Sequence, residues 1–156
     1  MNALLLFSHG SVLCGAGQTL EMQAARLRES GAAPIVEIGY LNYSEPLFAE
    51  AFERCVEQGA MKITVVPYFL VAGKFVRVDL PVEIQKQRAR FPDVEVQVAE
   101  AMRFHENLAD AIVACAGRAQ PPAAWRDILK MAPERCRASE ECPLYGTEDC
   151  PATNTI

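Results

Sequence analysis

The sequence predicts an α/β fold with a four-stranded, mostly parallel sheet and helices on both of its faces. Short apolar runs of strand length alternate along the chain with segments whose apolar residues recur at helical spacing. The apolar runs are continuous, as in strands buried on both faces, and such strands are joined by right-handed crossovers through helices. With 156 residues, 51% of them hydrophobic, the chain is long enough for one domain with a substantial core.

The first part of the chain is expected to form two strands with a helix between them. Residues 4–7 read Leu-Leu-Leu-Phe and form the first strand. A helix follows over 18–29, because its apolar residues share one face, and Gly31 ends it. Residues 34–40 form the second strand.

The next helix is expected to begin at Ser44-Glu45-Pro46, because Ser is a favourable N-cap and Pro is tolerated in the first turn. We expect it to end near Gln58. Residues 62–71 carry the strongest strand signal of the chain. Pro67 has no backbone N–H to donate, so we place it near the end of this strand or at an irregularity.

The remaining elements complete the body. They are a helix over 80–91, a strand over 94–98 and a last core helix over 107–116. Two consecutive prolines then mark a change in composition. We therefore divide the chain into an α/β domain, 1–117, and a C-terminal extension with cysteines, 118–156.

Composition excludes several classes of protein. The net charge of −5 argues against a nucleic-acid partner, which would need a basic surface. No apolar run approaches the ~18 residues of a membrane span, and the N-terminus lacks the features of a secretory signal. We therefore predict a cytoplasmic protein. In that reducing compartment the cysteines of the body, Cys14, Cys55 and Cys115, are expected to be thiols.

The most informative segment is Ser8-His9-Gly10-Ser11, which directly follows the first strand. Ligands of open α/β sheets bind beyond the carboxyl ends of the strands, where we expect this segment to meet the loops at 40–45 and 71–76. Imidazole is the commonest metal ligand and titrates near neutral pH, so His9 is the candidate catalytic and metal-binding residue. The alternative is a simple turn in which backbone groups satisfy His9.

Three segments together, 4–11, 45–51 and 65–81, resemble the small sirohydrochlorin chelatases, the CbiX-type members of the class II chelatase family. They read LLLFSHGS, EPLFAEA and VVPYFLVAGKFVRVDLP. The resemblance covers about residues 1–117. It implies a flavodoxin-like, three-layer α/β sandwich and the insertion of Co²⁺ or Fe²⁺ into sirohydrochlorin, a lyase reaction of cobalamin or sirohaem biosynthesis. It also implies two lobes that face each other across a cleft, here in a homodimer.

The resemblance implies a set of imidazoles and a carboxylate that together hold the metal and accept the pyrrole protons, and His9 matches the first histidine of that set. Two positions depart from the family's pattern. Phe75 stands where a second histidine is usual, and Asn42 stands where an acidic residue is usual. Phe75 cannot bind a metal, and Asn42 offers only a neutral oxygen.

Two functions follow from these departures. One is a chelatase with altered helper residues, and the other is a degenerate paralogue that binds a tetrapyrrole or a metal without insertion. A third function, phosphoryl transfer through His9, is disfavoured because no Arg precedes His9 and no Gly-rich phosphate loop follows it.

Further residues are candidates for binding. His105, after the fourth predicted strand, is a candidate second metal ligand, with a capping or surface histidine as the alternative. Lys74 and Arg77 suit the carboxylates of a tetrapyrrole, with ordinary solvated charges as the alternative. The predicted substrate-binding residues are Ser8, Gly10, Ser11, Tyr40, Asn42, Gly73, Lys74, Phe75 and Arg77.

The extension carries Cys136, Cys142 and Cys150, whose spacing is looser than that of zinc motifs. Three thiolates in a short segment could hold a metal or an iron–sulfur cluster, with a fourth ligand from elsewhere. Free thiols and a disulfide are the alternatives.

Overall fold

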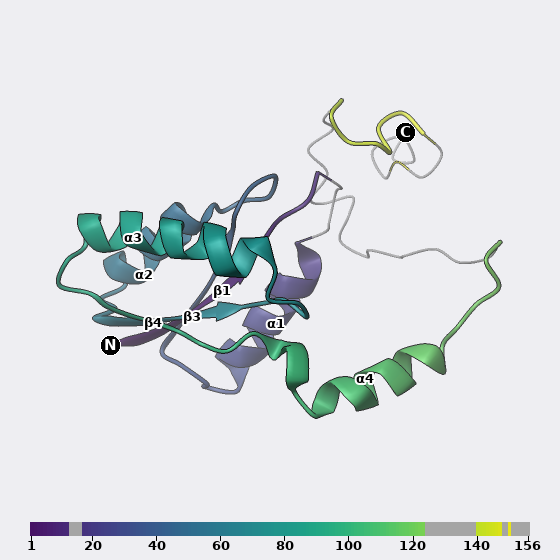
Figure 1. Cartoon of the computed structure of the whole chain (residues 1–156), viewed down its shortest axis with the longest axis horizontal. Coiled ribbons are helices and arrows are strands. Elements are labelled where there is room, and N and C mark those ends of the chain that lie inside the picture. Colours follow the sequence, from purple (N-terminus) through teal and green to yellow (C-terminus); the bar gives the residue numbers. More distant parts are fainter. Residues whose placement is uncertain (13–16, 124–139, 148–149, 151–156) are drawn as a thin grey trace.

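A four-stranded parallel sheet with the strand order β2-β1-β3-β4 forms the centre of the structure (Figure 1). The computed structural model describes residues 1–12, 17–123, 140–147 and 150. All strand pairs are parallel, which confirms the predicted α/β class and four-stranded sheet. The strands are β1 (Asn2–Ser8), β2 (Ile35–Tyr40), β3 (Lys62–Pro67) and β4 (Glu95–Val98).

Strand β1 lies between β2 and β3 and is buried on both faces of the sheet. Leu5 and Phe7 belong to one hydrophobic cluster, and Leu6 belongs to a second one on the opposite face. Successive side chains of a strand point to opposite faces, so a strand covered on both sides needs apolar residues at every position. This requirement explains the unbroken apolar run of β1.

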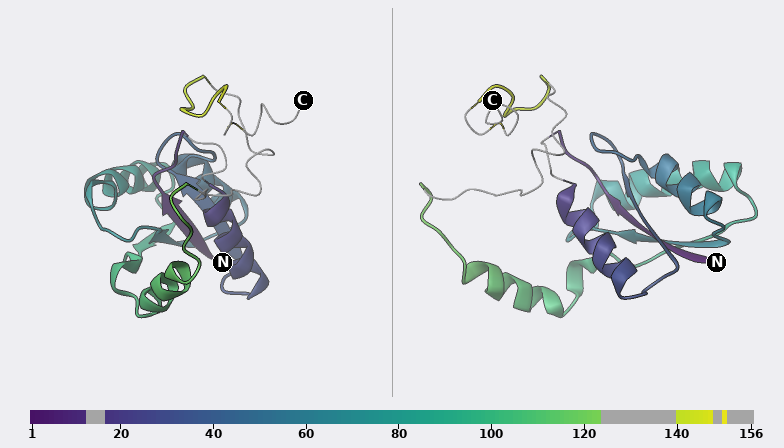
Figure 2. Two further views of the ribbon diagram at one scale, coloured as in Figure 1. Left: turned by 90° about the vertical axis from the view of Figure 1, so that its right-hand side faces the viewer. Right: turned by 180° about the vertical axis from the view of Figure 1, so that it is seen from behind.

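Helices cover the two faces of the sheet (Figure 2). Helix α1 (Gln18–Glu29) lies on one face, with Leu20 and Ala24 buried, and its bounds are those that the sequence predicts. Helices α2 (Phe48–Glu57) and α3 (Leu80–Arg90) lie on the other face. The flavodoxin-like three-layer arrangement is thereby confirmed.

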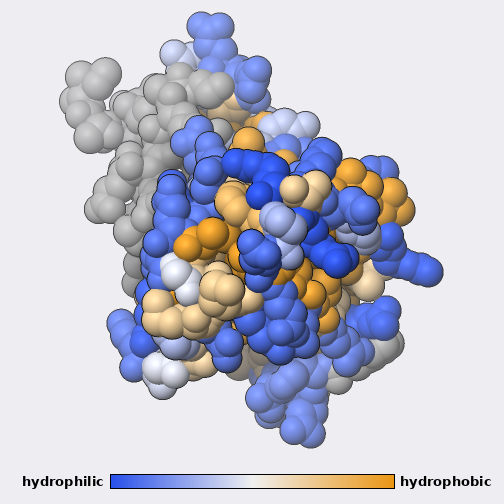
Figure 3. Space-filling view, turned by 90° about the vertical axis from the view of Figure 1, so that its left-hand side faces the viewer, coloured by the Kyte–Doolittle hydropathy of each residue, from blue (hydrophilic) through white to orange (hydrophobic). Residues whose placement is uncertain are grey.

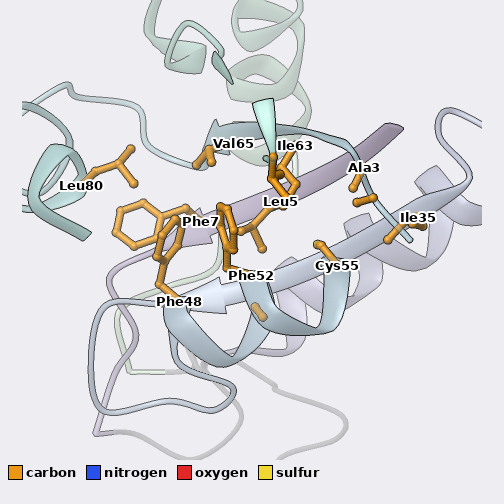
Figure 4. Packing of buried hydrophobic residues seen from close by; sticks show 13 residues of the cluster. Ala3, Leu5, Phe7, Ile35, Phe48, Phe52, Cys55, Ile63, Val65 and Leu80 are labelled. Atoms are coloured by element: carbon orange, nitrogen blue, oxygen red, sulfur yellow. The ribbon is translucent and has the colours of Figure 1, made fainter. Parts of the chain in front are cut away.

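Aromatic side chains fill the core between α2 and the sheet (Figure 4). The rings of Phe7 and Phe48 meet edge to face with their centroids 5.4 Å apart, and the centroids of Phe48 and Phe52 are 6.1 Å apart. Each fully buried phenylalanine contributes about 1.5–3 kcal/mol through burial of apolar surface. These contacts fix α2 against β1.

The predicted start of α2 is wrong. The helix begins at Phe48, and the backbone N–H of its N-cap residue Leu47 donates to the Glu50 carboxylate over 2.9 Å. Ser44 does not cap the helix, because its hydroxyl oxygen accepts a hydrogen bond from the backbone N–H of Ser11. A long-range partner thus replaces the local one that the sequence suggests.

Strand β3 is shorter than predicted. It ends at Pro67, which agrees with the expected position of Pro67 near the strand's end, whereas residues 68–71 belong to a loop. The chain then forms a π-helical turn, η1 (Phe75–Asp79), that continues directly into α3. The helix predicted over 80–91 is present and ends at Arg90.

Helix α4 (Asn107–Ala116) has the predicted bounds, but the prediction of a core helix is wrong. After the short turn η2 (Met102–Phe104), α4 extends away from the body (Figure 1). None of its residues is buried, and Ile112 and Val113 are 69% and 72% exposed. The helix forms because its local signal is strong, but the body leaves it without a covering surface.

The described part of the extension consists of turns, with Cys142 and Cys150 buried. Cys14 and Cys136 lie outside the described residues, and the division of the chain at 117/118 stays a prediction. Among the residues that the structure describes, no helix combines the length and apolar character that crossing a membrane requires.

The burial of Cys55 predicts selective thiol chemistry. Burial, with a smaller effect of Glu37, raises the pKa of the Cys55 thiol to about 12. At pH 8 only roughly one Cys55 in 10⁴ is then a thiolate, the reactive form. Iodoacetamide should label exposed Cys115 in the native protein and label Cys55 only in urea, as read by peptide mass spectrometry. Equal labelling of both cysteines in the native protein would contradict the buried position of Cys55.

Candidate functional site

His9 lies at the carboxyl edge of the sheet, at the point where the order of the strands reverses. From β1 the chain moves to β2 on one side and later returns to β3 on the other side. In doubly wound sheets this reversal leaves a crevice between the loops that follow the two diverging strands, and ligands bind there. His9 follows β1, while Phe69 and Phe75 lie in the segment after β3.

Two aromatic rings contact the imidazole of His9. The Phe75 ring stacks on it, with the centroids 5.6 Å apart and the planes inclined by 29°. The Phe69 ring lies 6.0 Å away and also packs against Phe7 of the core. His9 is exposed, and 40% of Phe75 is exposed, so the aromatic contacts run from the core to the surface at this edge.

The histidine has a defined orientation. Its Nδ1 atom makes a short contact with the carbonyl oxygen of Gly10. A carbonyl can only accept, so this contact favours the neutral tautomer in which the Nδ1–H donates a hydrogen bond to Gly10. Nε2 then carries the lone pair, as in histidines that bind metals through Nε2 while a backbone carbonyl holds Nδ1.

Hydrogen bonds connect the loop after β1 to the loop after β2. The backbone N–H of Leu41 donates to Ser8 over 2.9 Å, and that of Asn42 donates to the His9 carbonyl over 3.2 Å. The N–H of Ser11 donates to the hydroxyl of Ser44 over 3.1 Å. The predicted meeting of the His9 loop with the Asn42 and Phe75 segments is therefore confirmed.

Gly10 is required where these two loops touch. It adopts a φ of +84°, and a Cβ atom at this position would lie 1.7 Å from the backbone oxygen of Asn42. Gly73 differs, since nothing lies within 4 Å of a Cβ atom placed on it. Both glycines were predicted from the sequence as site residues, but the packing demands a glycine only at Gly10.

Tyr40 and Asn42 contribute in different ways. Tyr40 is buried in the cluster beneath α1, and its hydroxyl donates to the carbonyl of Gly17 over 3.1 Å. It holds the start of α1 to the end of β2, which agrees with core packing. Asn42 is half-buried and is tied through its backbone. Direct contact of either side chain with a ligand stays a prediction.

The two cations near Phe75 have different surroundings. The Lys74 ammonium forms an ion pair with Asp79, 2.7 Å away across η1, although its side chain is 72% exposed. Arg77 is exposed and forms no ion pair with any residue that the structure describes. Arg77 is therefore the cation more available to an anionic ligand. Asp79 and Ser44 were not predicted as site residues, because only the folded loops place Asp79 beside Lys74 and Ser44 beside Ser11.

His105 lies in a different environment from His9. It lines a groove together with Leu6, Val66 and Tyr68, which belong to or adjoin the α1 side of the sheet. Its Nδ1 accepts a hydrogen bond from the backbone N–H of Asn107 over 3.3 Å, as expected for a capping histidine. The role of His105 as a second metal ligand stays a prediction.

The described residues contain no cluster of three or more His, Cys, Asp or Glu side chains suited to a metal ion. His9 is therefore not part of a group of three such ligands within the described residues. The prediction of a metal or iron–sulfur cluster on the extension is not supported at Cys142 and Cys150, and Cys136 lies outside the described range.

The comparisons with known proteins agree with this geometry. The CbiX family model matches residues 3–119. A sirohydrochlorin ferrochelatase of Priestia megaterium is 37% identical over 114 residues, which are 72% of this chain and 42% of that protein. A sirohydrochlorin cobaltochelatase of Methanocaldococcus jannaschii is 42% identical over 81 residues, 52% of this chain and 57% of that protein. The chain thus spans about half the length of these curated relatives.

Solved structures show the same fold. The sirohydrochlorin chelatase SirB from Bacillus subtilis subspecies spizizenii, determined in complex with cobalt, superposes with a TM-score of 0.70 at 29% sequence identity. The match covers 74% of this chain and 50% of that one. A CbiX protein from Marinobacter aquaeolei matches with a TM-score of 0.57 at 26% identity, over 75% of this chain and 95% of that one.

The contrast between the two glycines of the site is testable. Gly10→Ala should lower the free energy of unfolding by roughly 2 kcal/mol or more. The alanine would have to adopt the left-handed backbone conformation of Gly10, and its Cβ atom would clash with the backbone of Asn42. Gly73→Ala is the matched control and should change it by less than about 0.5 kcal/mol. Urea denaturation followed by circular dichroism measures both. Equal effects of the two substitutions would contradict the close contact at Gly10.

Proposed function

The chain belongs to the CbiX family, and we propose that it forms one lobe of a tetrapyrrole chelatase that inserts Co²⁺ or Fe²⁺ into sirohydrochlorin. The observation that carries the proposal is His9, an oriented imidazole at the β1/β3 crevice with its Nε2 lone pair available. The named activities of the relatives support the same reaction.

Insertion requires that a pyrrole nitrogen lose its proton while the metal exchanges its ligands. Nε2 of His9 can hold the incoming ion or accept a proton, but it cannot do both at once. Asn42 provides no base, and Phe75 provides no ligand. We therefore expect weak metal binding and slow insertion by this chain, with Arg77 available to the carboxylates of the substrate.

A second candidate function is binding of a tetrapyrrole without insertion. The stacking of Phe75 on His9 favours it, because this position adds aromatic surface and removes a metal ligand. A spectral titration separates the two functions, since adding sirohydrochlorin and then Co²⁺ reports binding and insertion as successive changes in absorbance.

Metal affinity at the site should depend on His9. In isothermal titration with Co²⁺, His9→Ala should abolish binding at this site, and His105→Ala should weaken it only if the two imidazoles share the ion. The double substitution Phe75→His with Asn42→Glu should raise the affinity tenfold or more, because an added ligand contributes on the order of 1.4 kcal/mol. It should also speed insertion by supplying a carboxylate as proton acceptor. Wild-type insertion as fast as that of the double variant would refute the view that the site is weakened.

We also propose that the chain is a homodimer in the cytoplasm. Helix α4 is apolar around most of its surface yet exposed, and its Leu108 and Ala111 form part of the wall of a groove of about 840 Å³. The rest of that wall is mainly apolar and includes Leu6, Val66 and Tyr68. Two copies related by a twofold axis can each place α4 in the other's groove. The thiol state of Cys55 and Cys115 suits a reducing compartment.

Sedimentation equilibrium tests the dimer. Ile112→Lys should weaken self-association by tenfold or more, because it places a charge in the buried interface, while Asp110→Lys on the opposite side of α4 serves as the matched control. A wild-type chain that is monomeric at micromolar concentration would overturn the proposal. So would a loss of stability in Ile112→Lys without any change in association, since α4 would then pack within its own chain.

A further inference from the structure

We propose that the outer edge of β2 is a docking site for an extended polypeptide segment of a partner protein, which adds to the sheet as a short antiparallel strand. The segment carries a basic side chain toward its N-terminal end and an acidic side chain toward its C-terminal end. None of the residues assigned to the crevice of His9 lines this site, so the inference does not depend on the proposed function.

One residue of β2 presents its backbone groups to a ligand. Strand β2 pairs only with β1, so its other edge faces away from the sheet. On that edge the Val36 carbonyl accepts a hydrogen bond from Nε of Arg28 over 2.9 Å. Further along, the Tyr40 N–H donates to the Pro46 carbonyl over 3.0 Å. Alternate residues of a strand direct their backbone groups to the same edge, so the N–H and carbonyl of Ile38 also point outward, and no backbone group of a described residue outside the sheet bonds to them.

A groove of about 480 Å³ surrounds this open position. Residues of α1 form one of its walls, and Arg54 of α2 contributes to the other. Ile38 packs on the α1 side of the sheet, whereas Glu37 accepts a hydrogen bond from Gln58 at the end of α2. The groove therefore follows the edge of β2 between the two helical layers.

The groove fits a segment of limited length. From Val36 to Tyr40 the strand advances by about 13 Å, at the usual rise of 3.3 Å per residue, so an extended segment of three or four residues fits between Arg28 and Pro46. At the end of the body where the strands begin, hydrophilic side chains surround smaller hydrophobic areas (Figure 3). A segment that continued past Arg28 would find little continuous apolar surface there.

The two ends of the groove carry opposite charges. Glu21 lies in the first turn of α1, which begins beside the carboxyl end of β2, and Glu45 lies in the loop that follows β2. Arg28 and Arg54 lie in the last turns of α1 and α2, toward the amino end of β2, because both helices run antiparallel to the strand. A segment with one basic and one acidic end is therefore attracted in a single orientation.

The open position suits an antiparallel segment. In an antiparallel pair, two opposed residues exchange both of their hydrogen bonds, so one residue of the ligand satisfies the N–H and the carbonyl of Ile38. Peptides that add to a sheet edge gain affinity from such main-chain bonds and specificity from their side chains. The N-terminal end of an antiparallel segment lies at the acidic, carboxyl end of β2, so its basic residue must precede its acidic one.

The test uses nuclear magnetic resonance of the full ¹⁵N-labelled chain with two capped peptides, acetyl-Lys-Val-Thr-Val-Glu-amide and the charge-reversed acetyl-Glu-Val-Thr-Val-Lys-amide. Dissociation constants come from the shift of the Ile38 amide signal, and the exchange of that amide with solvent reports its hydrogen bond. The amides of β4, at the opposite edge of the sheet, are the internal control. The variants are Arg54→Glu and Glu45→Lys, with Arg88→Glu on the exposed side of α3 as the matched control.

We expect the Lys-first peptide to shift the Ile38 amide, to slow its exchange and to bind at least about fivefold more tightly than the Glu-first peptide. Arg54→Glu and Glu45→Lys should each remove this preference, whereas Arg88→Glu should keep it. Equal affinities of the two peptides in wild type, shifts of the same size in β4, or an unchanged Ile38 signal at millimolar peptide would overturn the inference.

A second copy of this chain is the competing occupant of the edge. Sedimentation equilibrium of wild type and Arg54→Glu, with and without the Lys-first peptide, separates it from a partner segment. If Arg54→Glu changes self-association and the peptide does not bind, β2 pairs with its own copy and the inference fails. If the peptide binds at Ile38 without any change in association, the inference stands.

Discussion

The pairing of β1 with both β2 and β3 is the constraint on which the candidate site depends. In this register Ser8 lies opposite Tyr40, and Phe7 lies opposite Pro67, so three loops leave the sheet at the same level. The hydrogen bonds beyond the strands continue this pairing, from Leu41 to Ser8 and from Tyr68 to Phe7. A shift by one residue would turn the alternating side chains of β1 to the wrong faces of the core. The buried run that stabilises the fold therefore also positions His9.

The two departures from the family's pattern have a common chemical consequence. Phe75 and Asn42 stand at the usual positions of a histidine and an acid, and both remove charge or ligand strength from the crevice. What remains is the imidazole of His9, the aromatic rings of Phe69 and Phe75, and the exposed cation Arg77. Such a surface would discriminate poorly between free ions in water, but it suits a large conjugated ligand with carboxylates at its edge.

Local signals predicted much of the fold, and long-range contacts account for the differences. The bounds of α1 and α4 agree with the sequence, since periodicity and Gly31 or Gly117 define them locally. Ser44 was misinterpreted because it forms a typical N-cap pattern with Pro46, whereas its actual partner, Ser11, lies 33 residues away. The exposure of α4 could not be predicted, because periodicity identifies an apolar helix but not the surface that covers it.

The same distinction applies to the site. The position of His9 at the carboxyl edge follows from the alternation of strands and helices. Its stacking on Phe75 depends on the π-helical turn after Gly73, which no pattern in the sequence indicates. The difference between Lys74, which is ion-paired, and Arg77, which is the more available cation, likewise depends on the contact of Lys74 with Asp79 within that turn.

The shape of a flat macrocycle relates the site to the assembly of the chain. His9 and the loops around it would cover one face of such a ligand and leave its other face uncovered by this chain. A conjugated ring with one face in water loses half of the apolar contact that burial could provide.

The exposed α4 and the groove that it lines leave apolar surface uncovered as well, which a single chain in water rarely tolerates. The open side of the ligand site and the apolar surface of α4 belong to the same chain, so a second copy related by a twofold axis can cover both. The assembly and the ligand site are therefore expected to depend on each other: a variant that separates the copies should weaken tetrapyrrole binding even when His9 and its aromatic neighbours are intact.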